Sequence, residues 1–401
     1  MKTQSHASIS VWRQIPKGVW ALGFVSLLMD VSSEMIHSLL PLFMVSVLGV
    51  TPLTIGLIEG VAEATALIVK VFSGVISDYL GKRKTLALIG YGLGAMTKPL
   101  FAIAGGAGMV LSARLLDRIG KGVRGAPRDA LVADITPAEI RGAAFGLRQS
   151  LDTVGAFLGP LLAVGLMLLW HDDFRAVFWV AVLPGMMAVL VLAFGVSEPP
   201  PIAKSLRRNP LQRENLKRLS AAYWQVVAVG AVFTLSRFSE AFLVLRAQQT
   251  GIAIAWTPLV MVAMNVVYAL AAYPFGKISD NYSHRALLTY GLLVLILADV
   301  LLAAATDWLL LIAGIACWGL HMGMTQGLLA KLVADTSPKD LLGTAYGFFN
   351  LVSGCAMLFA SGLAGMLWQY YGAASTFYMG AVFCGLTLLL LWGLLKPIAQ
   401  K

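Results

Sequence analysis

Ionisable side chains recur at helical spacing inside segments that are otherwise apolar. One segment, between residues 107 and 133, carries a set of five cations and one carboxylate that can be placed on one helix, namely Arg114, Asp117, Arg118, Lys121, Arg124 and Arg128; its second carboxylate is Asp129. At 100° per residue these six side chains fall within an arc of about 120° on a helix. If the segment crosses a membrane, each charge at bilayer depth costs about 2.5–3.5 kcal/mol, so this face must point to a wet cavity or to partners.

The cations of this helix are candidates for ligand binding. We expect Arg114, Arg118 and Lys121 to supply counter-charge to an anionic group, because a guanidinium can bind a carboxylate or phosphate through two parallel hydrogen bonds. Arg124 and Arg128 lie nearer the end of the segment and are expected to be anchors or helix-to-helix contacts. The competing interpretation is that nearby carboxylates already neutralise every cation, which would leave no charge for a ligand.

Two pairs of carboxylates form a second group. Asp30 and Glu34 are about one turn apart in the first apolar segment, and Glu59 and Glu63 are one turn apart in the next. Because consecutive membrane helices run in opposite directions, both pairs are expected at similar middle depths. A carboxyl group in a low-dielectric site, or beside another carboxyl, holds its proton more tightly. These four residues are therefore the predicted proton-coupling site, and a static charge network with the cations is the alternative.

Further candidates are sparser. Arg148 and Asp152 are one turn apart in a later segment, where a substrate contact, a proton site and a local ion pair are all compatible with the spacing. Glu240 is a reserve proton site in the second half of the chain. Polar or aromatic side chains of that half could also contact a substrate, and the candidates are Asn265, Trp318, His321 and Gln326. A hard-cation site formed by Asp30, Glu34 and His37 is a minor hypothesis, and no resident metal is expected.

The composition requires a membrane environment for these segments. Of the 401 residues, 58% are hydrophobic and only 12% are charged, and the mean hydropathy is +0.79. An ordinary globular chain is about 45–50% apolar and about 25% charged. The apolar runs are long rather than short and alternating, which predicts an all-α integral membrane protein instead of a β-barrel.

Twelve transmembrane helices fit the sequence. The predicted spans are 18–48, 53–80, 85–104, 107–133, 140–170, 174–196, 220–249, 256–281, 286–305, 308–335, 341–369 and 374–395. Lys and Arg gather near both ends of the chain and in every second loop, whereas the alternate loops near 49–53, 104–108, 249–256 and 368–375 have none. The positive-inside rule then places both termini in the cytoplasm of a multi-pass protein of the inner (plasma) membrane.

The two halves of the chain repeat one another. Gly74-Val-Ile-Ser-Asp78 returns as Gly276-Lys-Ile-Ser-Asp280, and Ser33-Glu34 returns as Ser239-Glu240. A Pro-rich and basic stretch separates the halves. The predicted organisation is a six-helix bundle in 1–196, a cytoplasmic linker in 197–219 and a second six-helix bundle in 220–401, related as parallel repeats.

The motifs between and within the spans resemble those of the major facilitator superfamily. The loop Gly74-x3-Asp78-x3-Lys82-Arg83-Lys84 is similar to that superfamily's signature, and Ala113-Arg114-Leu-Leu-Asp117-Arg118 is similar to its Arg-containing motif in the fourth helix. Gly155-x3-Gly159-Pro160 is similar to a motif associated with antiporters. The resemblance implies two pseudo-symmetric six-helix bundles. It also implies a conformational latch at one membrane surface, formed by Asp78, Arg83, Asp280 and Arg285.

These features favour a secondary transporter over other classes. An enzyme would need a nucleophile–base pair or a metal cluster, an ATP-driven pump would need a phosphate-binding loop, and a channel would not need two repeats with charges at mid-membrane. The main hypothesis is proton-coupled efflux of a small organic solute by alternating access. The alternatives are proton-coupled import of an anionic metabolite or a metal chelate such as a siderophore, and direct divalent-metal transport. We expect a monomer in the lipid bilayer that uses the proton gradient, with no cofactor and no nucleic-acid partner.

Overall fold

The computed structural model describes residues 14–198, 218–279, 282–325, 327–338 and 341–394. Within these ranges the chain is helical and contains no β-strand. The first half contains α2 (Lys17–His37), α3 (Leu40–Ser46), α4 (Pro52–Leu80), α5 (Arg83–Ala102), α6 (Ala107–Ile135), η1 (Ala138–Ile140), α7 (Arg141–Leu169) and α8 (Phe174–Gly195). The second half contains α10 (Ala221–Leu235), α11 (Ala241–Gln249), η2 (Ile254–Trp256), α12 (Leu259–Ser279), α13 (His284–Ala304), α14 (Trp308–Thr325), α15 (Leu328–Thr336), α16 (Leu342–Tyr371) and α17 (Ala373–Leu394).

Each of the twelve predicted spans corresponds to one helix or to two consecutive helices. Eight of these segments are both long and apolar enough to cross a membrane by composition alone. The other four fall short for local reasons, because α4, α5 and α6 carry several charged side chains and α10 is too short by itself. A test of helix length and mean hydropathy therefore does not detect spans whose charged residues lie inside the protein, away from lipid.

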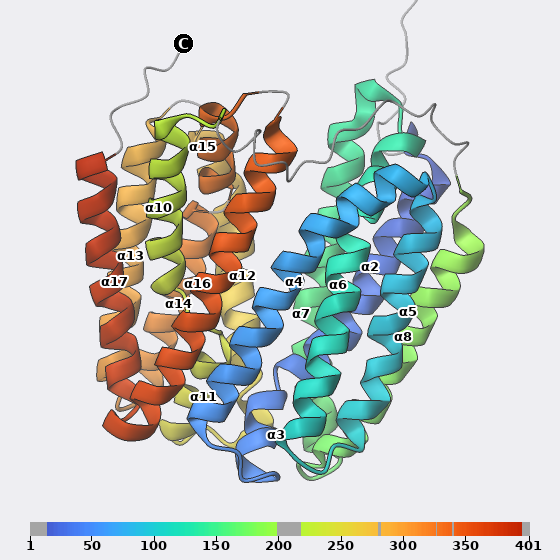
Figure 1. Cartoon of the computed structure of the whole chain (residues 1–401). Coiled ribbons are helices and arrows are strands. Elements are labelled where there is room, and N and C mark those ends of the chain that lie inside the picture. Colours follow the sequence, from blue (N-terminus) through green and yellow to red (C-terminus); the bar gives the residue numbers. More distant parts are fainter. Residues whose placement is uncertain (1–13, 199–217, 280–281, 326, 339–340, 395–401) are drawn as a thin grey trace, which may run out of the picture.

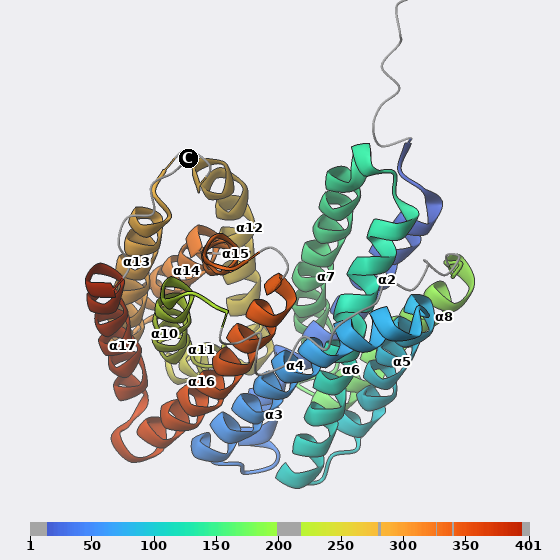
Figure 2. The same cartoon turned by 45° about the horizontal axis from the view of Figure 1, so that its top comes forward.

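The helices form two bundles that face each other. Helices α2–α8 lie on one side and α10–α17 on the other (Figure 1). The ribbons of the two bundles come together around α3 and α11 and diverge toward the opposite end, where the described chain ends and where the two halves are joined (Figures 1 and 2). The alternation of helix directions thus brings both ends of the described chain, and the described residues on either side of the linker, to the same end of the molecule.

A continuous apolar core holds the converged end together. The larger core cluster contains Phe43 of α3 as well as Phe242 and Leu243 of α11, whereas the second cluster is confined to the first half. Helices α4 and α16 cross here at small residues. An added Cβ at Gly60 would lie 3.0 Å from the Leu358 carbonyl oxygen. The two bundles are therefore packed backbone to backbone at this end.

Two of the membrane spans are interrupted for reasons visible in the sequence. Pro41 lacks an N–H, so the carbonyl of His37 loses its helical donor and span 1 divides into α2 and α3. Gly327 adopts a positive φ of 77° between α14 and α15, a conformation that favours glycine. Both interruptions lie within spans that we had expected to be continuous helices.

A third interruption divides span 7 between α10 and α11, at residues 236–240, and neither proline nor glycine explains it. The backbone N–H of Ser239 donates a hydrogen bond of 3.1 Å to the hydroxyl of Ser361 in α16. The Ser236 hydroxyl donates to the Phe233 carbonyl at 2.7 Å. Side chains from within the bundle thus satisfy backbone groups that the helix would otherwise pair. The break presents several of its residues to the space between the bundles.

Candidate functional site

A cavity of about 310 Å³ lies between the two bundles, near the converged end. The first half contributes mainly charged side chains, namely Glu34, His37, Glu59, Glu63, Arg114, Arg118 and Lys121, together with Pro41. The second half contributes Arg237, Phe238, Ser239, Glu240, Ala241, Val244, Met261, Trp318 and Met357. The predicted central cavity is therefore present, and its two walls differ in chemistry.

Arg114 is fully engaged by protein groups at the deep end of this cavity. Its Nε lies 2.9 Å from Oε1 of Glu59, and its Nη2 bonds the second oxygen of the same carboxylate. Its Nη1 lies 2.6 Å from Nε2 of His37. Because a guanidinium can only donate, this His37 nitrogen must accept, so the ring is neutral and its Nδ1–H faces Glu34 at 3.6 Å. Arg114 and Glu59 are both almost completely buried.

Two further ion pairs surround the first. Arg118 Nη2 lies 3.0 Å from Glu63 Oε1 at the cavity wall. Behind that wall, Lys98 of α5 lies 2.9 Å from Asp117 Oδ1 and 3.0 Å from the Ser33 hydroxyl. For Arg114 and Arg118, the competing interpretation of the cationic helix therefore describes the structure better than the counter-charge interpretation does.

Four charged side chains in the cavity have no oppositely charged ion-pair partner within 4.0 Å among Lys, Arg, Asp and Glu of the described residues. Lys121 and Arg237 are the cations, and Glu34 and Glu240 are the carboxylates. Arg237 projects from the break in span 7, and its guanidinium carbon lies 5.6 Å from the centre of the Phe233 ring. The cavity thus offers charges of both signs that have no Lys, Arg, Asp or Glu partner among the described residues, although His37 lies near Glu34.

The wall from the second half is aromatic and apolar. Phe238 and Trp318 pack with their ring centres 5.5 Å apart, and Met261 and Met357 complete this side. The indole Nε1 of Trp318 is buried and has no hydrogen-bond acceptor among the described residues. An acceptor atom on a bound solute would satisfy this N–H.

A second charged cluster lies beside the cavity, where α2 packs against α7. The carboxyl of Asp30 is within hydrogen-bonding reach of Asp152. Oδ1 of Asp152 lies 3.6 Å from Nη1 of Arg148 and 3.8 Å from Nη1 of Arg128. Two carboxyl groups in contact can share one proton. From the sequence, Asp30 and Asp152 were separate candidates, and it was not predicted that they would lie together.

The glycines of the antiporter-like motif create this contact. An added Cβ at Gly155 would lie 2.6 Å from the Leu27 carbonyl oxygen and 3.0 Å from the Asp30 Cβ. At Gly159 it would lie 2.7 Å from the Glu34 Cβ. The motif is thus where α7 comes close enough to α2 to bring its side chains against Asp30 and Glu34.

Several predicted site residues lie outside the cavity in this structure. Arg148 faces Asp152 and Gln149, where Nη2 donates to the Gln149 amide oxygen at 2.9 Å. Asn265 does not line the cavity, whose nearest contribution from α12 is Met261. His321 is completely buried, and its Nδ1 lies 2.8 Å from the Gly291 carbonyl oxygen. Gln326 is outside the described residues.

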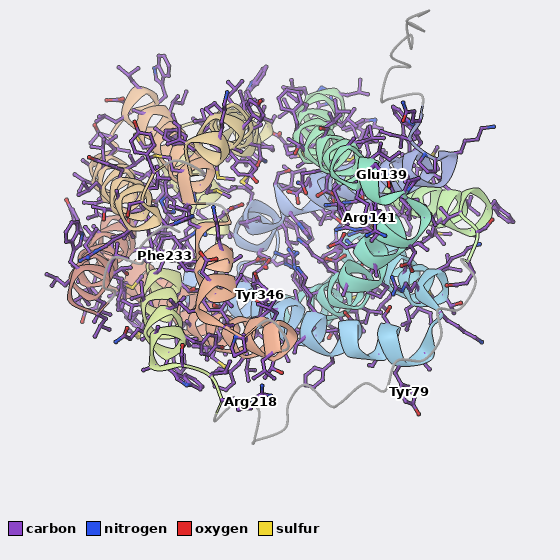
Figure 3. All side chains as sticks on the ribbon, turned by 90° about the horizontal axis from the view of Figure 1, so that it is seen from above. Tyr79, Glu139, Arg141, Arg218, Phe233 and Tyr346 are labelled. Atoms are coloured by element: carbon purple, nitrogen blue, oxygen red, sulfur yellow. The ribbon has the colours of Figure 1, made fainter. Side chains whose placement is uncertain are left out.

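Two of the predicted latch residues, Arg83 and Arg285, have partners within the described part of the structure. Arg83 Nη1 lies 2.6 Å from Oδ2 of Asp134 in α6, so it joins the ends of α5 and α6. Arg285 donates to the Trp392 carbonyl at 2.8 Å and covers the Trp392 ring. The side chain of Asp78 and the whole of Asp280 are outside the described structure. Figure 3 looks down on this end of the molecule, with Glu139 and Arg141 of the first bundle and Tyr346 of the second labelled.

Three charged residues inside the protein were not among the predicted site residues. Lys98 and Asp299 are completely buried, and Arg237 lines the cavity from the break in span 7. A charge inside an apolar run was the available signal for the first two.

The proposed hard-cation site does not form, since Asp30 turns to Asp152, and no group of three metal-binding side chains converges among the described residues.

Comparisons with known proteins agree with this architecture. The family model described as the Major Facilitator Superfamily matches residues 22–259 and 227–401. An uncharacterised MFS-type transporter of Methanocaldococcus jannaschii is 33% identical over 386 residues, covering 94% of this chain and 95% of the relative. The quinolone resistance protein NorA of Staphylococcus aureus is 23% identical over 299 residues, covering 73% of this chain and 75% of NorA.

Solved structures share the fold at low sequence identity. The nucleoside transporter NupG has a TM-score of 0.76 at 14% identity, covering 93% of this chain and 98% of its own. A POT family transporter in complex with 5-aminolevulinic acid has a TM-score of 0.78 at 15% identity, covering 94% and 96%. With a family model across nearly the whole length and a relative of one-third identity, this chain belongs to the Major Facilitator Superfamily of membrane transporters.

Proposed function

We propose that this transporter uses the proton gradient to export a small organic solute that carries both a positive and a negative group. As a member of its superfamily the chain is a transporter rather than an enzyme. The observation that carries the proposal is the set of unpaired cavity charges, Lys121 and Arg237 against Glu34 and Glu240. Charges in a confined, low-dielectric space are costly unless they are paired, and a dipolar solute would pair both kinds.

The aromatic wall fits the rest of such a solute. Phe238, Trp318 and the two methionines would cover an apolar or aromatic body, and the indole N–H of Trp318 would donate a hydrogen bond to a carbonyl or carboxylate oxygen of the solute. A cavity of about 310 Å³ is at the lower end of the range typical of small-molecule sites. The proposed solute is therefore small.

Proton coupling follows from competition for the same carboxylates. A proton on Glu34 or Glu240 removes the negative charge that a solute's ammonium group would need, so proton and solute exclude each other. The contacting pair Asp30 and Asp152 offers a second place for an exchangeable proton, beside Glu34 on α2. In this proposal Glu59 and Glu63 are held in ion pairs and serve structure more than coupling.

Export is proposed for two reasons. The Gly155 and Gly159 motif resembles that of antiporters, and a relative that aligns with most of this chain is named for quinolone resistance. With both termini on the cytoplasmic side, the bundles are converged on the outer side and diverge inward. The structure would then represent the inward-facing state, from which an exporter loads its solute.

Import of an anionic metabolite is the second candidate. It is favoured by the two unpaired cations and the unsatisfied Trp318 N–H, which together could hold a carboxylate. It differs from the main proposal in that Glu34 and Glu240 would have no cationic group to bind. The two candidates can be separated by the charge of the accepted solute and by the direction of net transport.

Proteoliposomes with an imposed pH gradient provide the test. A panel should contain an aromatic amino acid-like zwitterion, its ester, which is only cationic, and its N-acyl derivative, which is only anionic. Gradient-driven movement of the zwitterion against its concentration gradient supports export, whereas movement of only the acyl derivative supports the anionic alternative. Glu240→Gln should abolish coupling, and Lys70→Gln, an exposed α4 cation outside the cavity lining, is the matched control. Transport that ignores the pH gradient would refute the proposal.

A further inference from the structure

Asp299 in α13 is a buried carboxyl that lies outside the proposed transport site. Its side chain is completely shielded from solvent, and neither Oδ1 nor Oδ2 has a hydrogen-bond partner among the described residues. It lies outside the cavity lining and forms no ion pair within the described chain. A leucine of similar size would fill this place without burying polar atoms.

A glycine on the neighbouring helix makes room for this carboxyl, and the space that the Asp299 carboxyl occupies is called its seat below. An added Cβ at Gly380 of α17 would lie 2.6 Å from Oδ2 and 3.1 Å from Oδ1 of Asp299. Leu295 and Leu302, about one turn to either side on α13, are also completely buried. The carboxyl therefore lies flat against the α17 backbone in an apolar, closed space.

The charged and titratable groups around this seat are few. On α17 the thiol of Cys384, one turn beyond Gly380, is near enough to interact with both Asp299 and Ser236. On α14 His321 contacts α13 at Gly291, two turns from Asp299. On α15 Lys331 and Asp335 make no ion pair with Asp299 within 4.0 Å. Arg237 interacts electrostatically with Cys384, and among the described residues no cation pairs with Asp299 itself.

We infer that Asp299 is a proton-binding site in the second bundle, separate from the central cavity and occupied by a proton in this conformation. An isolated carboxylate in an apolar interior is so unfavourable that the group takes up a proton instead, giving a neutral O–H carboxyl. Because Ser236 and Arg237 belong to the break in span 7, Cys384 and Ser236 connect this seat to the cavity wall. A rearrangement of that break would give Asp299 access to water and release the proton, leaving the carboxylate.

The inference deepens the proposed proton coupling, but proton occupancy can be measured without any transport. Infrared difference spectroscopy of the full chain in nanodiscs, with isotope-labelled aspartate, should show the C=O stretch of a protonated carboxyl at neutral pH. This band should disappear in Asp299→Asn and persist in Asp307→Asn, which changes an exposed carboxylate that caps α14. Absence of an Asp299-dependent band in the folded wild-type protein would overturn the inference.

A second variant tests the same site in case Asp299→Asn does not fold, and a transport measurement tests the role of the site. Gly380→Ala pushes a methyl group onto the carboxyl and should shift the band, whereas Gly385→Ala, where an added Cβ meets no atom within 4 Å, should leave it in place. In proteoliposomes Asp299→Asn should lower the number of protons moved per solute without weakening solute binding. An unchanged ratio would exclude Asp299 from coupling, while a present band with proton-independent transport would refute the proposed function and leave the proton site standing.

Discussion

The charged side chains of the cavity are of two kinds, paired and unpaired, and these should respond differently to substitution. Arg114 and Glu59 form a two-point ion pair in which both side chains are almost fully buried. Burying two charges consumes most of the energy that their attraction provides, so the pair adds little net stability. Its members are nonetheless costly to separate, because one charge is then left without a partner.

Removal of one partner should therefore destabilise the protein strongly. We expect Glu59→Gln to lower the free energy of unfolding by about 3–5 kcal/mol, because the Arg114 guanidinium remains buried and unpaired. The double variant Glu59→Gln/Arg114→Gln should recover a large part of this loss. Thermal unfolding of the purified proteins in detergent measures both. A double variant no more stable than the single one would show that the pair is not an independent unit.

Lys121 should behave in the opposite way. It lines the cavity, is exposed to it and has no ion-pair partner within the described structure. Lys121→Gln should weaken binding of a solute with an anionic group by about tenfold or more, since a charged hydrogen bond contributes about 1.5–3 kcal/mol. The unfolding free energy should change by no more than about 0.5 kcal/mol. Calorimetric titration and thermal unfolding of the same sample test this, and unchanged affinity together with lost stability would assign Lys121 a structural role.

At the scale of helices, backbone contact between α2 and α7 decides where the carboxylates lie. Gly155 allows the Leu27 carbonyl and the Asp30 side chain to approach closer than any larger residue would permit. The same helix carries Gly165, at which an added Cβ would meet no atom within 4 Å. The two positions form a matched pair on one element.

Gly155→Ala should accordingly separate α2 from α7 and disturb the Asp30–Asp152 contact. We expect a loss of about 1–3 kcal/mol in the unfolding free energy, as for other overpacked interiors, and a marked loss of proton-driven transport. Gly165→Ala should keep both properties near wild type. Unfolding curves and transport measured for the two variants compare them directly, and equal behaviour would mean that close packing at Gly155 is not required.

At the scale of the whole molecule, the arrangement of helices places both described chain ends and the ends of the linker together (Figure 1). Described basic residues at the starts of helices, namely Arg83, Arg141 and Arg285, lie at this same end (Figure 3), which predicts that it faces the cytoplasm. After replacement of Cys317, Cys355 and Cys384, single cysteines in residues 204–218 should react with an impermeant thiol reagent only in permeabilised cells. Single cysteines near Gly49 and Gly251 should react in intact cells. The reverse pattern would invert the topology and turn the proposed exporter's loading state into its release state.

The sequence by itself determined the membrane class, the twelve spans, the repeat and the residues that could bear charge at depth. It could do so because the length of an apolar segment, the helical spacing of its charges and the charge of its loops are local properties that determine how the segment inserts into a bilayer. Pro41 and Gly327 likewise indicate breaks in spans 1 and 10, although the spans had been expected to be continuous. The presence of Glu34, Arg118 and Lys121 in the cavity was also predictable, because charges on one helical face must avoid lipid.

Only the tertiary structure decided which of these charges remain available. Helical spacing does not show that Arg114 pairs with Glu59 or that Asp117 pairs with Lys98. Nor does it show that Asp30 of α2 meets Asp152 of α7. These choices depend on how closely neighbouring helices approach, and glycines at their crossings set that approach. The break that presents Arg237 and Glu240 to the cavity could not be predicted from the sequence either, because the hydroxyl of Ser361, in a helix distant along the chain, stabilises it. Which buried charges pair depends on contacts between helices, and the spacing of residues along the sequence does not show these contacts.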